Sequence, residues 1–379
     1  MKIIDIKNNC ILPFNGMQID TDGRISPCCM YKNDYDPEHK IYKINEYQDY
    51  WTVDAPRIQK EFLNGGYAKG CDTCFNTTND ITSGLRYNIT KNYRKFHQTE
   101  TPQWLDLRFG NYCNLKCIMC HTDLSSQIHL EQHSNYEKFK AIGITPIEFK
   151  QFPWWEDPEI FSTVLGIVKQ ATYISFSGGE PLLTKQLYQV LEVANPNAII
   201  SFNTNLTSLT DKHIEALKKF RDVKINVSLD GVSEHHEYIR YGSKWSVIED
   251  NIFKLLTFKN INVNITYLLQ HTSIYTFPDF YSFIKRISDH NIHEINISTV
   301  YSQSVGGQDM MTINSVLPEE VDRFRQWIVE NLNDYQDIIC QWLDMYKFNP
   351  VAHQKFKDYV LLLDQLRGCN FRDTFNPNW

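Results

Sequence analysis

Between residues 104 and 300 the chain alternates short runs of period-two hydrophobicity with runs of helical periodicity. Alternation of apolar and polar side chains predicts β-strands, and strands that alternate with helices predict a parallel sheet. We expect strands at 105–109, 173–177, 199–205, 223–230, 263–270 and 295–300. Helices should lie between them, because apolar residues recur there at spacings of three and four, as at Phe161, Val164 and Val168.

One face of each expected strand is polar. In 223–230, for example, Val223, Ile225 and Val227 alternate with lysine, asparagine and serine. Parallel strands that are covered on both faces are usually apolar on both. If the sheet curls into a barrel with helices outside, the polar face lines the lumen and suits a polar ligand. The alternative is an amphipathic sheet exposed on one side.

Two segments flank this block of strands and helices. Residues 1–102 are rich in cysteine and in turn-forming residues, and residues 301–379 are mostly helical in pattern. We therefore expect three parts, 1–102, 103–300 and 301–379.

Residues 122–156 form a long insertion between the first strand and its helix. Asp157-Pro158 predicts the start of that helix, because a capping residue is followed by proline. A lid or a substrate contact is expected in the insertion.

Composition narrows the classes of function. The chain of 379 residues is 42% hydrophobic and 22% charged with a formal net charge of −7, as in a folded globular protein without a basic surface for nucleic acid. The first residues show no signal-peptide pattern and no stretch reaches the length of a membrane span, so we expect a cytoplasmic protein. Ten cysteines in a reducing compartment favour metal binding over disulfides.

Three of these cysteines, Cys113, Cys117 and Cys120, follow the first expected strand, at the end where barrel enzymes place their active sites. Three thiolates on one short loop can hold three irons of a four-iron cluster and leave the fourth iron open. Structural zinc is the alternative, but it requires four ligands, and only His121 stands nearby as a fourth.

The second expected strand runs into Ser177-Gly178-Gly179-Glu180-Pro181. Two glycines allow the backbone to approach a ligand closely. A simple turn is the alternative, since glycine and proline are common in turns.

These motifs together resemble the radical S-adenosylmethionine (SAM) superfamily over about residues 103–300: CxxxCxxC after strand one, Gly-Gly-Glu-Pro after strand two, and Ser228-Leu-Asp230-Gly231 with Arg240. The resemblance implies an α/β fold, a partial TIM-type barrel of six strand–helix units. It also implies that SAM chelates the open iron and is cleaved, after transfer of one electron, to a 5'-deoxyadenosyl radical that abstracts hydrogen from a substrate. An electron donor of the flavodoxin or ferredoxin type is implied as a partner.

The resemblance also suggests which residues contact SAM. It assigns the turn to the amino group and three polar residues to the ribose or carboxylate, and it places a methionine where the family usually has an aromatic residue against the adenine. The residues are Gly178, Gly179 and Glu180 for the amino group, Asn203, Ser228 and Arg240 for the ribose or carboxylate, and Met119 for the adenine. For Arg240 a position on a helix surface is the alternative.

A second group of cysteines lies near the amino terminus. Cys10 and Cys28 flank Gly23 in the spacing C-x12-G-x4-C, and Cys71 and Cys74 form a CxxC pair. The pattern resembles the SPASM/twitch extension of the same superfamily, which implies an auxiliary 4Fe-4S cluster held by these four thiolates. Cys29 is an alternative to Cys28, and zinc is an alternative to the cluster. The extension usually follows the barrel, whereas here the cysteines precede it.

The class of substrate is indicated only by the resemblance to this family. Relatives with this extension commonly modify ribosomally made peptides or proteins, and others act on small polar molecules such as aminocyclitols, sugars or nucleosides. We expect a peptide or protein substrate, with a small polar molecule as the alternative. A non-catalytic zinc-binding scaffold is a further alternative. His235 and His236 are expected to be solvated on a loop.

Overall fold

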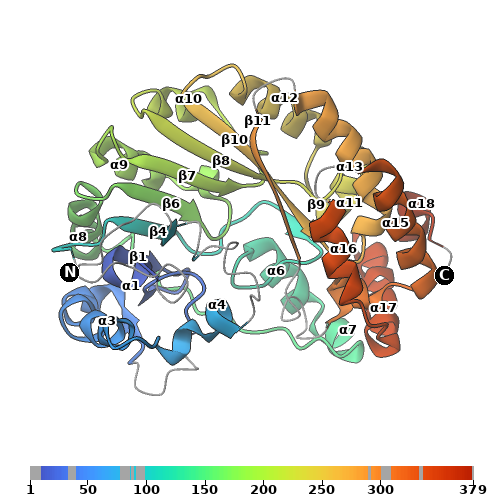
Figure 1. Ribbon diagram of the computed structural model, residues 1–379, viewed down its shortest axis with the longest axis horizontal. Coiled ribbons are helices and arrows are strands. Elements are labelled where there is room, and N and C mark those ends of the chain that lie inside the picture. Colours follow the sequence, from blue (N-terminus) through green and yellow to red (C-terminus); the bar gives the residue numbers. More distant parts are fainter. Residues whose placement is uncertain are drawn as a thin grey trace. The chain divides into compact units, whose positions relative to one another are not determined.

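The computed structural model describes most of the chain (Figure 1). The described residues are 10–32, 40–76, 86, 89–90, 99–288, 292–299, 309–332 and 336–377. They form two compact units that are each discontinuous in sequence: 1–112 with 150–203 and 210–224, and 113–149 with 204–209 and 225–379. In the described residues no helix is both long enough and apolar enough to cross a bilayer.

The first unit is organised around a sheet in which six strands lie in the order β7, β6, β4, β1, β2, β3 (Figure 1). β4, β6 and β7 are parallel neighbours, and β1 pairs in parallel with β4, so that Gly16 lies opposite Trp104. The cysteine-rich amino-terminal segment therefore extends the same sheet as the first barrel strands. The strands are β1 (Gly16–Ile19), β2 (Arg24–Ser26), β3 (Tyr42–Lys43), β4 (Trp104–Arg108), β6 (Tyr173–Ser177) and β7 (Ile199–Thr204).

Helices in this unit follow the sequence signals. The side chain of Asp157 accepts hydrogen bonds from the backbone N–H groups of Glu159 and Ile160, which confirms the predicted start of α8. Phe161, Val164 and Val168 of α8 are buried, as predicted. The α-helices are α1 (Leu12–Asn15), α2 (Tyr47–Asp49), α3 (Ala55–Leu63), α4 (Asp72–Asn76), α8 (Pro158–Val168), α9 (Gln186–Val193) and α10 (Asp211–Leu217). Short 3-10 turns cover Ile44–Glu46, Lys69–Cys71 and Pro181–Leu183, and Tyr50–Asp54 is a π-helix.

The second unit holds the later barrel strands and a separate small ribbon. β10 and β11 are parallel and in contact along their lengths, and the Leu229 N–H that follows β8 donates to the carbonyl oxygen of Thr266 in β10. β5 and β9 form a two-stranded antiparallel ribbon. The strands are β5 (Lys116–Cys117), β8 (Asp222–Ser228), β9 (Arg240–Tyr241), β10 (Ile261–Leu269) and β11 (Ile292–Thr299), of which β8 begins in the first unit.

Helices make up the rest of the second unit. The insertion contains α6 (Ser126–Ser134) and α7 (Tyr136–Ala141). α11 (Ser233–Ile239), α12 (Trp245–Leu255) and α13 (Ser273–Ser288) connect the strands, and the tail forms α15 (Pro318–Asn331), α16 (Gln336–Asp344), α17 (Pro350–Arg367) and α18 (Phe371–Phe375), with 3-10 turns at Asp309–Met311 and Ile313–Ser315. His235 and His236 lie on α11, and His236 is fully buried. The expectation that both histidines are solvated on a loop was wrong, because a loop pattern does not reveal which side of a short helix is covered.

The predicted fold class is confirmed. All six strands expected from the pattern are present as β4, β6, β7, β8, β10 and β11, with helices between them. The alternation of apolar and polar residues in the sequence corresponds to alternating burial in the structure. Val223, Ile225 and Val227 of β8 are buried, whereas the intervening polar side chains are only half-buried. The apolar face therefore carries the core, as hydrophobic burial requires.

The glycine pair after β6 makes a close backbone contact within the first unit. The Glu180 N–H donates to the carbonyl oxygen of Tyr112 at 2.8 Å, and the Gly179 N–H donates to that of Gly110 at 3.2 Å. A Cβ on Gly179 would lie 2.2 Å from the Tyr112 oxygen, and Gly178 has a φ of +103°. Glycine is therefore required in this turn because its backbone approaches residues 110–112 closely.

A buried ion pair braces the start of the second unit. Arg367, the last residue of α17, binds both carboxylate oxygens of Glu131 on α6, at 3.2 and 2.6 Å. Lys116 of β5 approaches the same carboxylate at 3.0 Å. Burial raises the pKa of Glu131, but the hydrogen bonds from Arg367 and Lys116 outweigh it and hold the pKa below its usual value. The carboxylate is therefore charged and depends on its partners.

Replacing Arg367 with alanine should destabilise the protein strongly. The side chains of Arg367 and Glu131 are 1% and 5% exposed, so the substitution leaves a buried carboxylate whose remaining partner among the described residues is Lys116. We expect the free energy of unfolding in urea to fall by about 3–5 kcal/mol. The control is Lys218→Ala, which removes the exposed pair with Glu215 and should cost about 1 kcal/mol or less. Equal losses in the two variants would contradict the role of burial.

Replacing Gly179 with alanine should also destabilise the fold, because the added methyl group meets a backbone carbonyl that has little room to move. We expect a loss of about 1–3 kcal/mol in the free energy of unfolding. Gly166→Ala is the matched control, since nothing lies within 4 Å of a Cβ at that helical position and alanine favours helix. A Gly179→Ala protein as stable as the Gly166→Ala protein would refute the close contact.

Candidate functional site

The loop that carries Cys113, Cys117 and Cys120 lies at the start of the second unit and is tied down at several points. Cys117 pairs with Arg240 in the β5–β9 ribbon, and the next residue, Ile118, donates its N–H to the carbonyl oxygen of Ile239 at 2.9 Å. The carbonyl oxygen of Ile118 accepts a hydrogen bond from the hydroxyl of Tyr359 in α17. The loop is thus held by backbone pairing and by the tail helix before any metal binds.

The three thiols are withdrawn from solvent. Cys113 is 9% exposed and Cys117 7%, and Cys120 is half-buried. Burial raises the pKa of Cys120, and the neighbouring Cys117 and Cys113 raise it further, because adjacent negative charges repel. Three thiolates this close require a compensating positive centre. A bound metal cluster supplies such a centre, so the three thiols are suited to hold one.

Two polar side chains reach the sulfurs. The Arg240 Nη1 donates to Cys117 Sγ at 3.8 Å, and the Asn205 Nδ2 donates to Cys113 Sγ at 3.9 Å. Arg240 also binds the fully buried carboxylate of Asp230 at 2.7 Å. Burial would lower the pKa of Arg240, but Asp230 and Cys117 raise it, so the guanidinium stays charged. Hydrogen bonds to cluster sulfurs are one of the factors that set a cluster's potential.

Arg240 is therefore not a surface residue. Its side chain is 11% exposed and its Nε is committed to Asp230. The sequence reading missed the roles of Asp230 and Asn205, although Asp230 stood within the Ser228-Leu-Asp-Gly motif and Asn205 at the end of an expected strand. The sequence feature that could have indicated these two roles is a polar residue at the carboxyl end of an expected strand.

The residues expected to contact SAM are distributed over both units. Glu180 is buried and its carboxylate accepts the N–H of Leu182, so it caps the 3-10 turn at Pro181–Leu183. Asn203 of β7 is exposed, and Met119 is 7% exposed within an apolar cluster. Ser228 ends β8 and is half-buried. The assignment of these residues, with Gly178, Gly179 and Arg240, to one cofactor stays a prediction.

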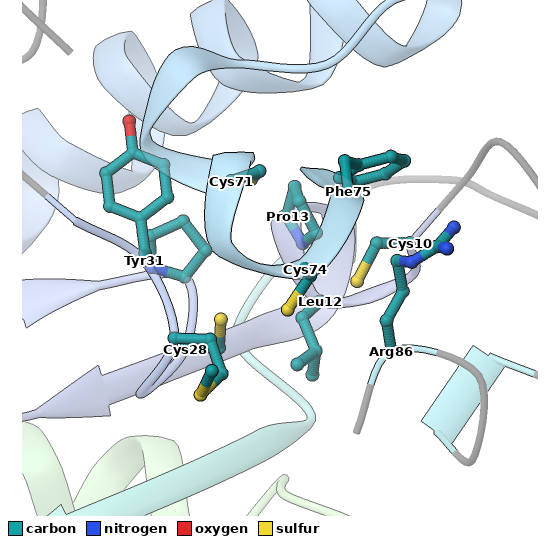
Figure 2. A pocket seen from close by; sticks show the side chains of 11 residues that line it. Cys10, Leu12, Pro13, Cys28, Tyr31, Cys71, Cys74, Phe75 and Arg86 are labelled. Atoms are coloured by element: carbon teal, nitrogen blue, oxygen red, sulfur yellow. The ribbon is translucent and has the colours of Figure 1, made fainter. Parts of the chain in front are cut away.

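The amino-terminal cysteines converge in the first unit. Cys10, Cys28, Cys71 and Cys74 line one small cavity with mainly apolar neighbours, among them Leu12, Pro13, Tyr31 and Phe75 (Figure 2). Cys10 precedes α1, Cys28 follows β2, and Cys71 and Cys74 lie about one helical turn apart at the start of α4. Cys29 is exposed and is not among the residues that line the cavity.

Arg86 enters the same cavity and was not singled out by the sequence. Its guanidinium lies over the ring of Phe75, 4.2 Å from the centroid. Burial raises the pKa of Cys10 to about 11, whereas Arg86 and a hydrogen bond from Thr90 oppose the rise. Burial likewise raises the pKa of Cys74, and Arg86 again opposes it. Arg86 therefore reduces the cost of forming thiolates in this cavity, although burial still holds the pKa of Cys10 and of Cys74 above the usual value.

Comparison with known proteins supports the same chemistry. The Radical SAM superfamily matches residues 107–284. A probable GTP 3',8-cyclase of Methanocella arvoryzae is 31% identical over 132 residues, which are 34% of this chain and 34% of that protein. Another, of Methanocaldococcus jannaschii, is 28% identical over 187 residues, 48% of this chain and 55% of that protein. The chain thus spans between a third and about half the length of the curated relatives it matches.

Among solved structures, Streptococcus suis SuiB bound to S-adenosylmethionine is similar over 88% of this chain and 71% of that chain, with a TM-score of 0.43 and 12% identity. Similarity at this level is distant, and the assignment of the family rests on the sequence match. Members of this family use SAM and a 4Fe-4S cluster, which the three thiols on one loop fit. Residues 107–284 of this chain thus form a domain that matches the Radical SAM superfamily.

Proposed function

We propose that this chain is a radical SAM enzyme in which Cys113, Cys117 and Cys120 hold a 4Fe-4S cluster with one iron open to SAM. The observation that carries the proposal is the loop itself, with three covered thiols on eight residues that are braced by backbone pairing to β9. Three protein ligands leave one corner of a four-iron cluster available. The match of residues 107–284 to the family supports the same role.

When bound, the cluster and SAM supply one-electron cleavage of the sulfonium and an organic radical. The protein's own residues prepare the site for that chemistry. Asp230 fixes the guanidinium of Arg240 at 2.7 Å and thereby aims it at Cys117. Asn205 donates to Cys113 and is itself oriented by Asn114 at 3.1 Å and by Thr207 at 2.6 Å. These donors stabilise negative charge on the two sulfurs.

We further propose that Cys10, Cys28, Cys71 and Cys74 hold an auxiliary 4Fe-4S cluster of the SPASM/twitch type. Four thiolates close a cluster, so this site would serve electron transfer or structure rather than bind SAM. The shared cavity supports Cys28 over Cys29 as the fourth ligand. Arg86 would offset part of the negative charge of the four thiolates.

The substrate we propose is a peptide or protein, from the resemblance to SPASM/twitch enzymes. A small polar molecule of the nucleotide class is the second candidate, because the matched relatives carry the name probable GTP 3',8-cyclase. The two candidates differ in what they donate, a Cα or side-chain hydrogen in one case and a ribose hydrogen in the other. Incubation with deuterated peptides or deuterated nucleotides should place deuterium in 5'-deoxyadenosine for one class alone.

Iron content and SAM cleavage test the enzyme proposal. Protein prepared without oxygen should contain about eight irons per chain, four for each cluster, and should convert SAM to 5'-deoxyadenosine when reduced with dithionite. The Cys113→Ala, Cys117→Ala, Cys120→Ala triple variant should lose about four irons and all cleavage. The Cys10→Ala, Cys71→Ala double variant is the matched control, and it should lose about four irons but retain cleavage.

Cleavage by the triple variant at the rate of the unaltered protein would overturn the SAM site. Zinc in place of iron in the oxygen-free protein, with all sulfur ligands, would overturn both clusters. Loss of iron in Cys29→Ala, with full iron retained in Cys28→Ala, would reverse the choice between these two neighbours.

A further inference from the structure

His129, His133 and Glu148 form a cluster of metal-ligating side chains outside both cysteine groups. In the described residues it is the one group in which three such ligand atoms lie within 4.8 Å of one another. His129 and His133 are four residues apart on α6, which places both rings on one face of the helix. Glu148 comes from the irregular segment that follows α7. All three belong to the second unit.

The histidines are arranged as metal-binding histidines are. The Nε2 of His133 lies 3.3 Å from the carbonyl oxygen of Ile147 and, since a carbonyl can only accept, must carry the proton in that contact. In the neutral ring the Nδ1 then carries the free lone pair, and it lies 3.6 Å from the Glu148 carboxylate. A hydrogen bond from one ring nitrogen to a carbonyl oxygen is the usual support of a histidine that binds metal through the other.

His129 offers a second donor. Its ring centroid lies 4.2 Å from that of His133. The Nδ1 of His129 is buried and, among the described residues, has no hydrogen-bond partner. A buried polar atom without a partner carries a free-energy cost that a bound cation would remove. The opposite face of α6 is occupied, because Glu131 is bound there by Arg367 and Lys116.

We propose that His129, His133 and Glu148 bind one zinc ion, with water in the fourth position. Two imidazoles and one carboxylate are ligands that zinc accepts in a tetrahedral site, whereas calcium and magnesium prefer oxygen alone. The ion would tie residues 147–149 to α6. Ile144 and Pro146 just before them are buried, but the side chains of Ile147 and Glu148 are 71% and 78% exposed and have no regular secondary structure around them.

The site lies in the insertion that follows the cysteine loop, and α6 is fixed to that loop. The Ser126 hydroxyl donates to the carbonyl oxygen of Cys113 and accepts from its N–H, both at 3.3 Å, and the Ser125 hydroxyl donates to the Leu115 carbonyl. A zinc on the outer face of α6 would therefore order the insertion beside the loop without using any thiol. Its ligands are separate from those proposed for iron.

Zinc binding by the full-length, cluster-loaded protein tests this site. After equilibration with zinc chloride and removal of free metal, we expect one zinc per chain by elemental analysis. X-ray absorption at the zinc edge should show nitrogen and oxygen neighbours only. His133→Ala and His129→Ala should each lose the zinc, and Glu148→Gln should bind it at least about tenfold more weakly. Glu137→Gln, an exposed carboxylate on α7, is the matched control and should bind zinc normally.

Glu148 is exposed, so its conservative replacement should leave the fold intact and keeps the test informative if a histidine variant misfolds. Zinc should also slow cleavage within residues 147–149 by a protease in the unaltered protein and not in Glu148→Gln. Sulfur among the zinc neighbours, zinc retained by both His133→Ala and Glu148→Gln, or no zinc in the unaltered protein would each overturn the proposal. In the last case the neighbouring histidine rings and the His133–Glu148 contact are ordinary surface packing.

Discussion

The pairing of β5 with β9 is the interaction on which the candidate centre of the second unit depends. It joins two short strands of two residues each, yet it holds Cys117 opposite Arg240 and positions the peptide that follows. Leu115, Ile118 and Met119 of the loop are buried in an apolar cluster with residues of α17. β9, α17 and α6 hold the loop further through backbone and hydroxyl hydrogen bonds.

Two acid–base pairs of buried charged side chains lie around the cysteine loop. Asp230 with Arg240, and Glu131 with Arg367, each place an acid and a base where a lone charge would be costly. The first pair reaches a thiol and the second braces the helix that carries His129 and His133. Such pairs contribute less to net stability than to a defined arrangement of side chains, which is what a site for a metal cluster requires.

The first unit shows how the amino-terminal cysteines become part of the same architecture. β1 adds to the edge of β4, so the segment that carries Cys10 and Cys28 is built onto the barrel strands rather than folded alone. The long chain between Cys28 and Cys71 returns through α3 to complete the cavity, which Arg86 also enters. A four-thiol site made from such distant residues gains its order from the sheet.

Periodicity and spacing determined much of this protein. Strand and helix positions, the cap at Asp157 and the cysteine loop follow from local physics, since alternation and capping act within a few residues. Tertiary structure alone decided which side chains meet across long separations. Arg240 with Asp230 and Cys117, Arg86 with the four amino-terminal thiols, and Glu148 with the α6 histidines are examples. No sequence pattern marks these contacts, because they depend on how distant elements pack and on where burial leaves a polar atom in need of a partner.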